Sequence, residues 1–290
     1  MASAGGKVGV YTLGIFDVQN PSETEQNTMK QAAGTLATSG FNLFLLASMH
    51  VHDDGSLYFN DTPIVQNGQL AGQLAPQLPQ YIRTMKSGTN ATILASFGGG
   101  GKFNGNAVGF WDLSCIEKLI AEYPNPADNP FFQNLQCLFS NYPFDGLDID
   151  LESYTGYDSF TGTLVTLIRW LTANDHLATL CPYDDAAFWC QVIKQTESNG
   201  QPAVAWVNVQ GANESLGSFA AALKAVGIGT DAISGGLQVG AGPLPTAQVT
   251  QQFGALAKSG VTSGWLWNLD GIGVASAKAY AEAVAAGLQS

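Results

Sequence analysis

The chain has 290 residues, a length that suits either one large domain or two small ones. Apolar residues make up 46% and charged residues only 12%, so the chain can bury a sizeable core and is not expected to be intrinsically disordered. The formal net charge of -12 argues against a nucleic-acid-binding protein, which would present a basic face.

The first residues, Met1–Ser3, carry neither the charged nor the apolar region of a signal peptide. No apolar run in the sequence has the length of a membrane span. Two interpretations stay open, a cytosolic protein or a secreted one whose signal has been removed. The scarcity of lysine, the many small polar residues and the sequons at Asn60, Asn90 and Asn213 favour the second. We therefore expect an extracellular protein with no membrane partner.

From the N-terminus onward, apolar β-branched runs alternate with amphipathic segments. Eight runs have the composition of strands, namely Lys7–Thr12, Phe41–Ala47, Ala91–Phe97, Phe144–Asp150, Leu177–Cys181, Ala203–Val209, Ile233–Val239 and Gly264–Trp267. The clearest helical patterns cover Glu23–Thr38, Asp158–Thr172, Leu216–Val226, Thr246–Lys258 and Val274–Leu288. This alternation indicates an α/β fold with a parallel sheet.

Eight strand–helix repeats at this chain length predict a single (β/α)8 TIM barrel over residues 1–290. The alternative is an open doubly wound sheet, which would need a glycine-rich phosphate turn after the first strand. Tyr11–Gly14 is not such a turn. The glycine run Gly98–Gly101 directly follows the third predicted strand, so we expect it in a loop over the catalytic face of a barrel.

The most informative segment is Phe144–Glu152, which places acids at alternate positions, Asp148, Asp150 and Glu152. Side chains of a strand alternate between its two faces, so the acids share one face and the leucine and isoleucine residues between them share the other. In a barrel the apolar face packs against the helices, and the acids must then point inward and toward the C-terminal rim.

Carboxylates this close cannot all ionise readily, so the pKa of at least one must rise. A raised carboxyl pKa is what a general acid requires. The alternatives are a solvated acidic edge, which would not interleave so regularly with branched apolar residues, and a hard-cation site, which usually recruits ligands from neighbouring loops. We predict catalysis by the acids without a metal or a cofactor.

Three motifs in these strands resemble family 18 of the glycoside hydrolases. Asp145–Glu152 matches the family pattern DxxDxDxE, Ser96–Gly99 matches its SxGG element, and Trp267 ends the eighth strand, where members place the floor of a sugar subsite. The matches fall on the third, fourth and eighth strands, in the family's order, and are closest to compact class III-like chitinases.

The resemblance implies substrate-assisted retaining catalysis, an exception to the usual scheme of two carboxylates. Glu152 would protonate the leaving glycosidic oxygen, and the substrate's own acetamido carbonyl would attack the anomeric carbon. Asp150 would hold the acetamido nitrogen, and Asp148 would share a proton with Asp150 as a coupled pair. Asp145 has the opposite parity, so we expect it to support the strand or the adjacent loop.

Several residues are candidates for binding the sugar. Trp267 offers a flat apolar face, although Trp265 shares its strand face and either could instead belong to the core. Gly98, Gly99 and Tyr11 are further candidates, from the third and the first strand.

The sixth strand departs from the family pattern, because many members carry a tyrosine at its end that binds the reacting acetamido group. Here Gln210 or Ala212 takes that place, depending on the alignment. Gln210 could donate a hydrogen bond through its amide, and Tyr183, after the fifth strand, could substitute from another direction.

The departure leaves two alternatives to a chitinase. One is an endo-β-N-acetylglucosaminidase acting on N-glycans, and the other is an inactive sugar-binding relative. The presence of Glu152 favours activity.

A second polar cluster, His50–Asp54, contains an HxH pair that could bind zinc. His176 precedes a strand and so lies at the wrong end of a barrel to complete such a site. We predict a polar loop here, one that could border the sugar cleft. The sequence shows no G-x-S-x-G elbow and no P-loop.

The four cysteines match no zinc or redox motif. Two short-range disulfides, Cys115–Cys137 and Cys181–Cys190, and four buried thiols are equally open interpretations.

The resemblance, together with the inward-facing acids, implies a hydrolase that cleaves β-1,4 bonds adjacent to N-acetylglucosamine, and we expect it to be a monomer. Its partner would be a polysaccharide or glycan that contains this sugar, most simply chitin.

Overall fold

The computed structural model describes residues 6–16, 20–72, 74, 77–103, 106–152, 157–198, 200–210, 214–239, 242 and 244–290. Eight parallel strands form its centre: β1 (Val8–Thr12), β2 (Leu43–Val51), β6 (Thr92–Gly99), β9 (Gly146–Leu151), β10 (Leu177–Pro182), β11 (Val207–Val209), β12 (Ile233–Gln238) and β13 (Ser263–Trp267). Each pairs with the next, and β1 pairs with both β2 and β13, which closes the barrel. The prediction of a (β/α)8 barrel is therefore confirmed, and the open sheet is wrong.

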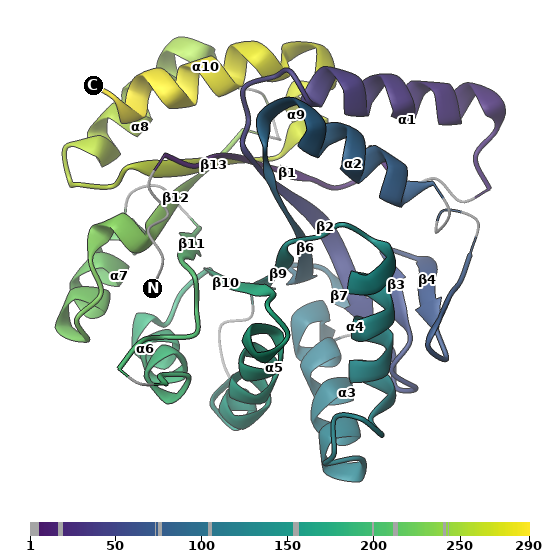
Figure 1. Ribbon diagram of the computed structural model, residues 1–290. Coiled ribbons are helices and arrows are strands. Elements are labelled where there is room, and N and C mark those ends of the chain that lie inside the picture. The colour runs from purple at the N-terminus through teal and green to yellow at the C-terminus, as the bar shows by residue number, and fades with distance from the viewer. Residues whose placement is uncertain are drawn as a thin grey trace.

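Helices surround the strands on the outside (Figure 1). They are α1 (Glu23–Leu36), α2 (Leu78–Thr89), α3 (Val108–Glu122), α4 (Pro130–Asn141), α5 (Thr161–Ala173), α6 (Ala186–Gln195), α7 (Glu214–Ala225), α8 (Thr246–Ala257), α9 (Leu269–Ile272) and α10 (Ala277–Leu288). Three short 3₁₀ helices cover Tyr157–Phe160, Thr230–Ala232 and Val274–Ser276. Among the described residues, none of these helices combines the length and the apolar character needed to cross a bilayer.

The barrel carries an extension at the C-terminal end of β2. The end of this strand pairs antiparallel with β3 (Leu57–Phe59), which is followed by β4 (Thr62–Gln66) and β5 (Gln69–Leu70). Because β3 supplies a partner there, β2 continues to Val51, and the predicted loop around His50 is wrong for this residue. A separate hairpin, β7 (Lys102–Phe103) with β8 (Asn106–Ala107), follows β6.

Helix α4 holds the extension in place. Asn129 caps its N-terminus by accepting hydrogen bonds from the first turn. Asn134, buried on the same helix, accepts from the Gly68 N–H at 2.7 Å and donates to the Gly55 carbonyl at 2.7 Å. One side chain thus ties two turns of the extension to the helix layer.

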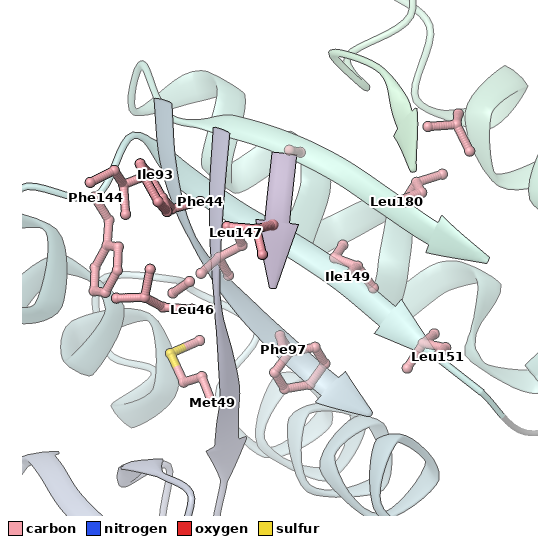
Figure 2. Packing of buried hydrophobic residues seen from close by; sticks show 14 of the residues in the cluster. Phe44, Leu46, Met49, Ile93, Phe97, Phe144, Leu147, Ile149, Leu151 and Leu180 are labelled. Atoms are coloured by element: carbon pink, nitrogen blue, oxygen red, sulfur yellow. The ribbon is translucent and has the colours of Figure 1, made fainter. Parts of the chain in front are cut away.

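The core has two layers, one on each side of the barrel wall. Leu147, Ile149 and Leu151 of β9 point outward into the cluster between strands and helices, where Phe97 joins them (Figure 2). A second cluster fills the barrel itself, with Tyr11, Leu43, Leu45, Ala47, Leu94, Cys181, Ala205, Trp206 and Trp265. The predicted outward face of β9 is confirmed.

All four cysteines are free thiols, so of the two interpretations left open the one with two disulfides is wrong. Three of the thiols are buried, and Cys137 is partly exposed. Cys181 lies inside the barrel, whereas Cys190 belongs to the outer cluster on α6. The barrel wall separates these two sulfur atoms. Burial raises the pKa of Cys115 to about 12, so this thiol stays protonated at neutral pH.

Candidate active site

A cavity of about 630 Å³ opens at the C-terminal ends of the strands. Residues from the ends of several strands and from the loops after them line it: Leu13, Ser48, His50, Asn60, Gly98, Gly99, Gly100, Gly101, Val108, Glu152, Tyr183, Gln210, Gly236, Leu237, Gln238, Trp265 and Trp267. The three alternating acids of β9 and its end, Asp148, Asp150 and Glu152, form a ladder that reaches this cavity. Asp148 and Asp150 are 0% and 2% exposed, and Glu152 is partly exposed in the cavity wall.

Asp148 accepts hydrogen bonds from four side chains on four different strands. One carboxylate oxygen accepts from the hydroxyl of Tyr11 and from the hydroxyl of Ser96, the latter at 3.4 Å. The other oxygen accepts from the Thr179 hydroxyl at 2.5 Å and from the Asn208 amide nitrogen at 2.8 Å. Burial raises the pKa of Asp148, while these hydrogen bonds lower it. Four donors match the acceptor capacity of an ionised carboxylate.

A neighbouring side chain fixes the amide of Asn208. The indole N–H of Trp206 donates to the Asn208 oxygen at 2.9 Å, which turns the Asn208 amide nitrogen toward Asp148. The donor is therefore oriented before any ligand binds.

Asp150 has fewer donors and more negative neighbours. Burial raises its pKa well above the usual range, and the charges of Glu152 and Asp148 raise it further. The amide nitrogen of Gln210 donates to Asp150 at 2.6 Å and, like the Cys181 thiol, opposes this rise. Of the two buried acids, Asp150 thus holds its proton more tightly than Asp148. Asp148 and Asp150 use different donors, so the proton shared between them stays a prediction.

Glu152 lies at the end of the ladder, where the chain leaves the strand. Burial raises the pKa of its carboxyl, and a hydrogen bond with Gln210 lowers it. A β-carbon on Gly100 would overlap the Glu152 carboxylate, so glycine alone leaves room for this position of the acid. Sequence reasoning missed Gly100, although the unbroken glycine run pointed to it.

The two glycines of the SxGG match serve close packing. Gly98 and Gly99 have φ angles of +101° and +110°, in the region that favours glycine. A β-carbon on Gly98 would overlap the Asp150 carbonyl, so glycine here lets β6 approach β9. Both residues line the cavity, and their role in binding substrate stays a prediction.

The aromatic candidates lie at different depths. Trp267 is partly exposed in the cavity wall, whereas Trp265 is 3% exposed and packs in the inner core. Tyr11 contacts both rings, at centroid distances of 5.0 and 4.8 Å, and is itself completely buried. Trp267 is thus the ring available to a sugar, and Tyr11 reaches the site only through Asp148.

The two candidates after the fifth and sixth strands both line the cavity. Tyr183 is 41% exposed, which is unusual for a large aromatic ring in this protein. The amide of Gln210 faces the acids and contacts both Asp150 and Glu152. Ala212, the other residue considered for the missing tyrosine, lies outside the described residues.

Asp145 takes the supporting role expected from its parity. Its carboxylate pairs with Lys86 of α2 at 2.7 Å and accepts from the Ile93 N–H at 2.7 Å. It therefore joins a helix to β6 before β9 begins.

Two other sequence features concern the Asn60 sequon and the HxH pair. The Asn60 amide lines the cavity and is held by the main chain, accepting from Ser48 at 3.0 Å and donating to Leu13 at 3.2 Å, which is unlike a glycosylated asparagine. For the HxH pair, His50 and His52, the sequence favoured a polar loop over a zinc site. Within the described part of the chain, no three ligand-type side chains are arranged to hold a metal ion.

Comparison with known family models finds no match, and comparison with curated proteins finds none. Solved structures do match over nearly the whole chain. The catalytic domain of a family GH18 chitinase from the fern Peteris ryukyuensis is 19% identical, with a TM-score of 0.58 over 97% of this chain and 99% of that one. A class V chitinase from Nicotiana tobaccum is 13% identical, with a TM-score of 0.61 over 97% and 99%.

A third structure, the glycoside hydrolase domain of PgaB from Bordetella bronchiseptica, is 14% identical, with a TM-score of 0.59 over 97% and 98% of the two chains. At these identities the likeness concerns the fold. The chain has a GH18 chitinase-like fold, in agreement with the resemblance in its motifs.

Proposed function

We propose that this protein is a glycoside hydrolase that cleaves β-1,4 bonds adjacent to N-acetylglucosamine, in chitin or chitooligosaccharides. The observation that carries the proposal is the graded burial of the acid ladder. Asp148 and Asp150 are enclosed in the barrel, and only Glu152 meets the cavity. Glu152 can therefore reach the substrate, while Asp148 and Asp150 lie behind it and set the electrostatic field around the reacting sugar.

Glu152 donates its proton to the glycosidic oxygen as the bond to the anomeric carbon breaks. The carbonyl oxygen of the substrate's acetamido group forms a bond to that carbon, which produces an oxazolinium ion. Asp150 passes its proton to Asp148 and, once ionised, accepts a hydrogen bond from the acetamido N–H and stabilises the positive charge. Water, deprotonated by Glu152, then opens the ring, so the configuration is retained.

The cavity walls supply contacts for the sugar. Trp267 presents an aromatic face for a pyranose ring, and Tyr183 adds a second, exposed ring to the cavity lining. Gln210 contacts both Asp150 and Glu152, so we assign to it the orientation of these acids, a task that differs from that of the tyrosine found in many family 18 members.

Glu152→Gln tests the proposal, because it removes the transferable proton and preserves the shape of the side chain. We expect turnover of chitooligosaccharides to fall at least on the order of 10³-fold, with the melting temperature nearly unchanged. Glu117→Gln, an exposed acid on α3, is the matched control and should keep full turnover. Substantial residual activity in Glu152→Gln would rule out the assigned acid.

The same assay separates the alternatives when a high-mannose glycoprotein is included and products are analysed by mass. Release of a glycan that leaves one sugar on the protein would select the endo-β-N-acetylglucosaminidase. Binding of chitooligosaccharides without cleavage by the wild type would select the lectin-like alternative.

We also propose that the whole chain, residues 1–290, forms one catalytic domain that acts as a monomer outside the cell. The extracellular location follows from the substrate, because chitin is a polymer deposited outside cells. Size-exclusion chromatography with light scattering at micromolar concentration tests the oligomeric state, and a dimer would contradict it.

A further inference from the structure

A buried carboxylate outside the acid ladder has no part in the proposed reaction. Asp112 of α3 is 0% exposed. One of its oxygens accepts from the Val51 N–H at 2.8 Å, and the other lies 3.0 Å from Nδ1 of His50. Burial raises the pKa of Asp112, and the contacts with His50 and Val51 lower it. Because burying a carboxylate is costly, its partners indicate what it does. Asp112 fixes the imidazole of His50.

His50 lies in the wall between the catalytic cavity and a neighbouring side pocket. Its side chain is 22% exposed and lines both the catalytic cavity and a side pocket of about 130 Å³. Asn60 and Val108 also line both spaces, so the side pocket continues the catalytic cavity. Since Nδ1 faces Asp112, Nε2 is the ring nitrogen that remains for a ligand.

The walls of the side pocket suit a sugar ring. Trp111 of α3 contributes a partly exposed indole, and the ring of His52 is braced by stacking on Tyr58 at 3.8 Å. Asn60 is held by main-chain groups, so it cannot easily turn away. Flat apolar surfaces combined with a few rigid polar groups are the usual composition of carbohydrate and small-molecule sites.

We propose that the side pocket is a second sugar subsite, in which His50, held by Asp112, hydrogen-bonds a hydroxyl or acetamido group of the sugar next to the one beside Glu152. This inference rests on the proposed function, because it assumes a chain of β-linked amino sugars in the cleft. His50 is then a binding residue that selects for longer chains, and Asp112 is a positioning residue that acts through it.

The test measures kcat/KM for chitooligosaccharides of two to six units and takes the ratio between the longest and the shortest chain cleaved. We expect the wild-type ratio to exceed one, and His50→Ala to lower it roughly threefold to tenfold, the worth of one hydrogen bond with its orientation. Asp112→Asn should lower the ratio less, because an amide still accepts from Val51. His176→Ala, at the opposite end of the barrel, is the matched control and should keep the wild-type ratio.

Melting temperatures identify variants that fail to fold, and His50→Asn, which keeps a polar planar group, replaces His50→Ala in that case. A wild-type ratio that does not exceed one, or equal ratios in the His50 and His176 variants, overturns the subsite and leaves the hydrolase intact. A wild type that cleaves no oligomer of any length overturns both.

Discussion

At the scale of single residues, two neighbouring carboxylates of β9 meet very different surroundings. Asp148 accepts from four neutral donors, whereas the donors to Asp150 are Gln210 and a thiol. The consequence is a division between the two acids, in which Asp150 holds its proton more tightly than Asp148. A proton held on Asp150 is available to move when the acetamido group arrives.

This division predicts a pH-dependent effect of Asp150→Asn on stability. A buried acid whose folded-state pKa is raised favours the folded protein below about pH 4, the unfolded value, and that contribution is lost as pH rises toward the folded value. Replacing it should therefore stabilise the protein increasingly as pH rises above about 4, by about 1.4 kcal/mol for each unit by which folding raises the pKa of this carboxyl. Urea denaturation at several pH values measures this. Asp53→Asn, at an exposed acid, should show no such trend, and a constant difference for Asp150→Asn would contradict the assignment.

Gly100 permits a second prediction at this scale. Its backbone lies outside the left-handed region, so alanine fits the main chain and only the Glu152 carboxylate must move. Gly100→Ala should lower kcat on the order of 10²-fold with little change in melting temperature, because a small displacement of the acid misaligns proton transfer.

Gly101→Ala is the matched control for this experiment. Its β-carbon would lie 3.4 Å from Val108, an ordinary contact, so kcat should stay near the wild-type value. Equal kcat values for the Gly100 and Gly101 variants would show that Gly100 does not seat the acid.

At the scale of elements, the extension of β2 forms one wall of the cleft. It contributes Asn60 directly, and the end of β2 contributes His50. The extension has no covering sheet, and α4 packs against it instead. The position of this wall therefore depends on α4, which is a second helix between β6 and β9, where a (β/α)8 barrel needs only one.

Asn134→Ala tests how firmly α4 holds the wall. The change leaves the Gly68 N–H and the Gly55 carbonyl without their partner, and we expect a loss of about 1–3 kcal/mol in the free energy of unfolding, measured with urea. Gln136→Ala, an exposed residue on the same helix, should change stability by less than about 0.5 kcal/mol. A similar small loss for Asn134→Ala would mean that packing alone fixes the extension.

Individual strands were predictable to different degrees. The run Ile233–Val239 predicts β12 almost to the residue, because its composition changes where the strand ends. The predicted sixth strand, Ala203–Val209, is longer than β11, which covers only Val207–Val209. In β2 the predicted end at Ala47 falls short, because the pairing of its last residues with β3 is a tertiary contact.

At the scale of the whole molecule, closure of the barrel gathers the donors of the acid ladder. Tyr11 and Asp148 are 137 positions apart, yet their side chains meet inside the barrel. Thr179 and Asn208 reach the same carboxylate from β10 and β11. Each is a lone polar residue at an inward position of an apolar strand, and that pattern is the signal by which the sequence could have identified them.

The sequence by itself determined the order of strands and helices and the face of β9 that carries the acids, since both follow from local periodicity. It also placed Trp267 and Glu152 at strand ends. Only the tertiary structure decided which side chains surround Asp148, that Gly100 seats Glu152, and that Asp112 holds His50. Such contacts join residues far apart in the chain, and packing in three dimensions, rather than any local repeat, brings them together.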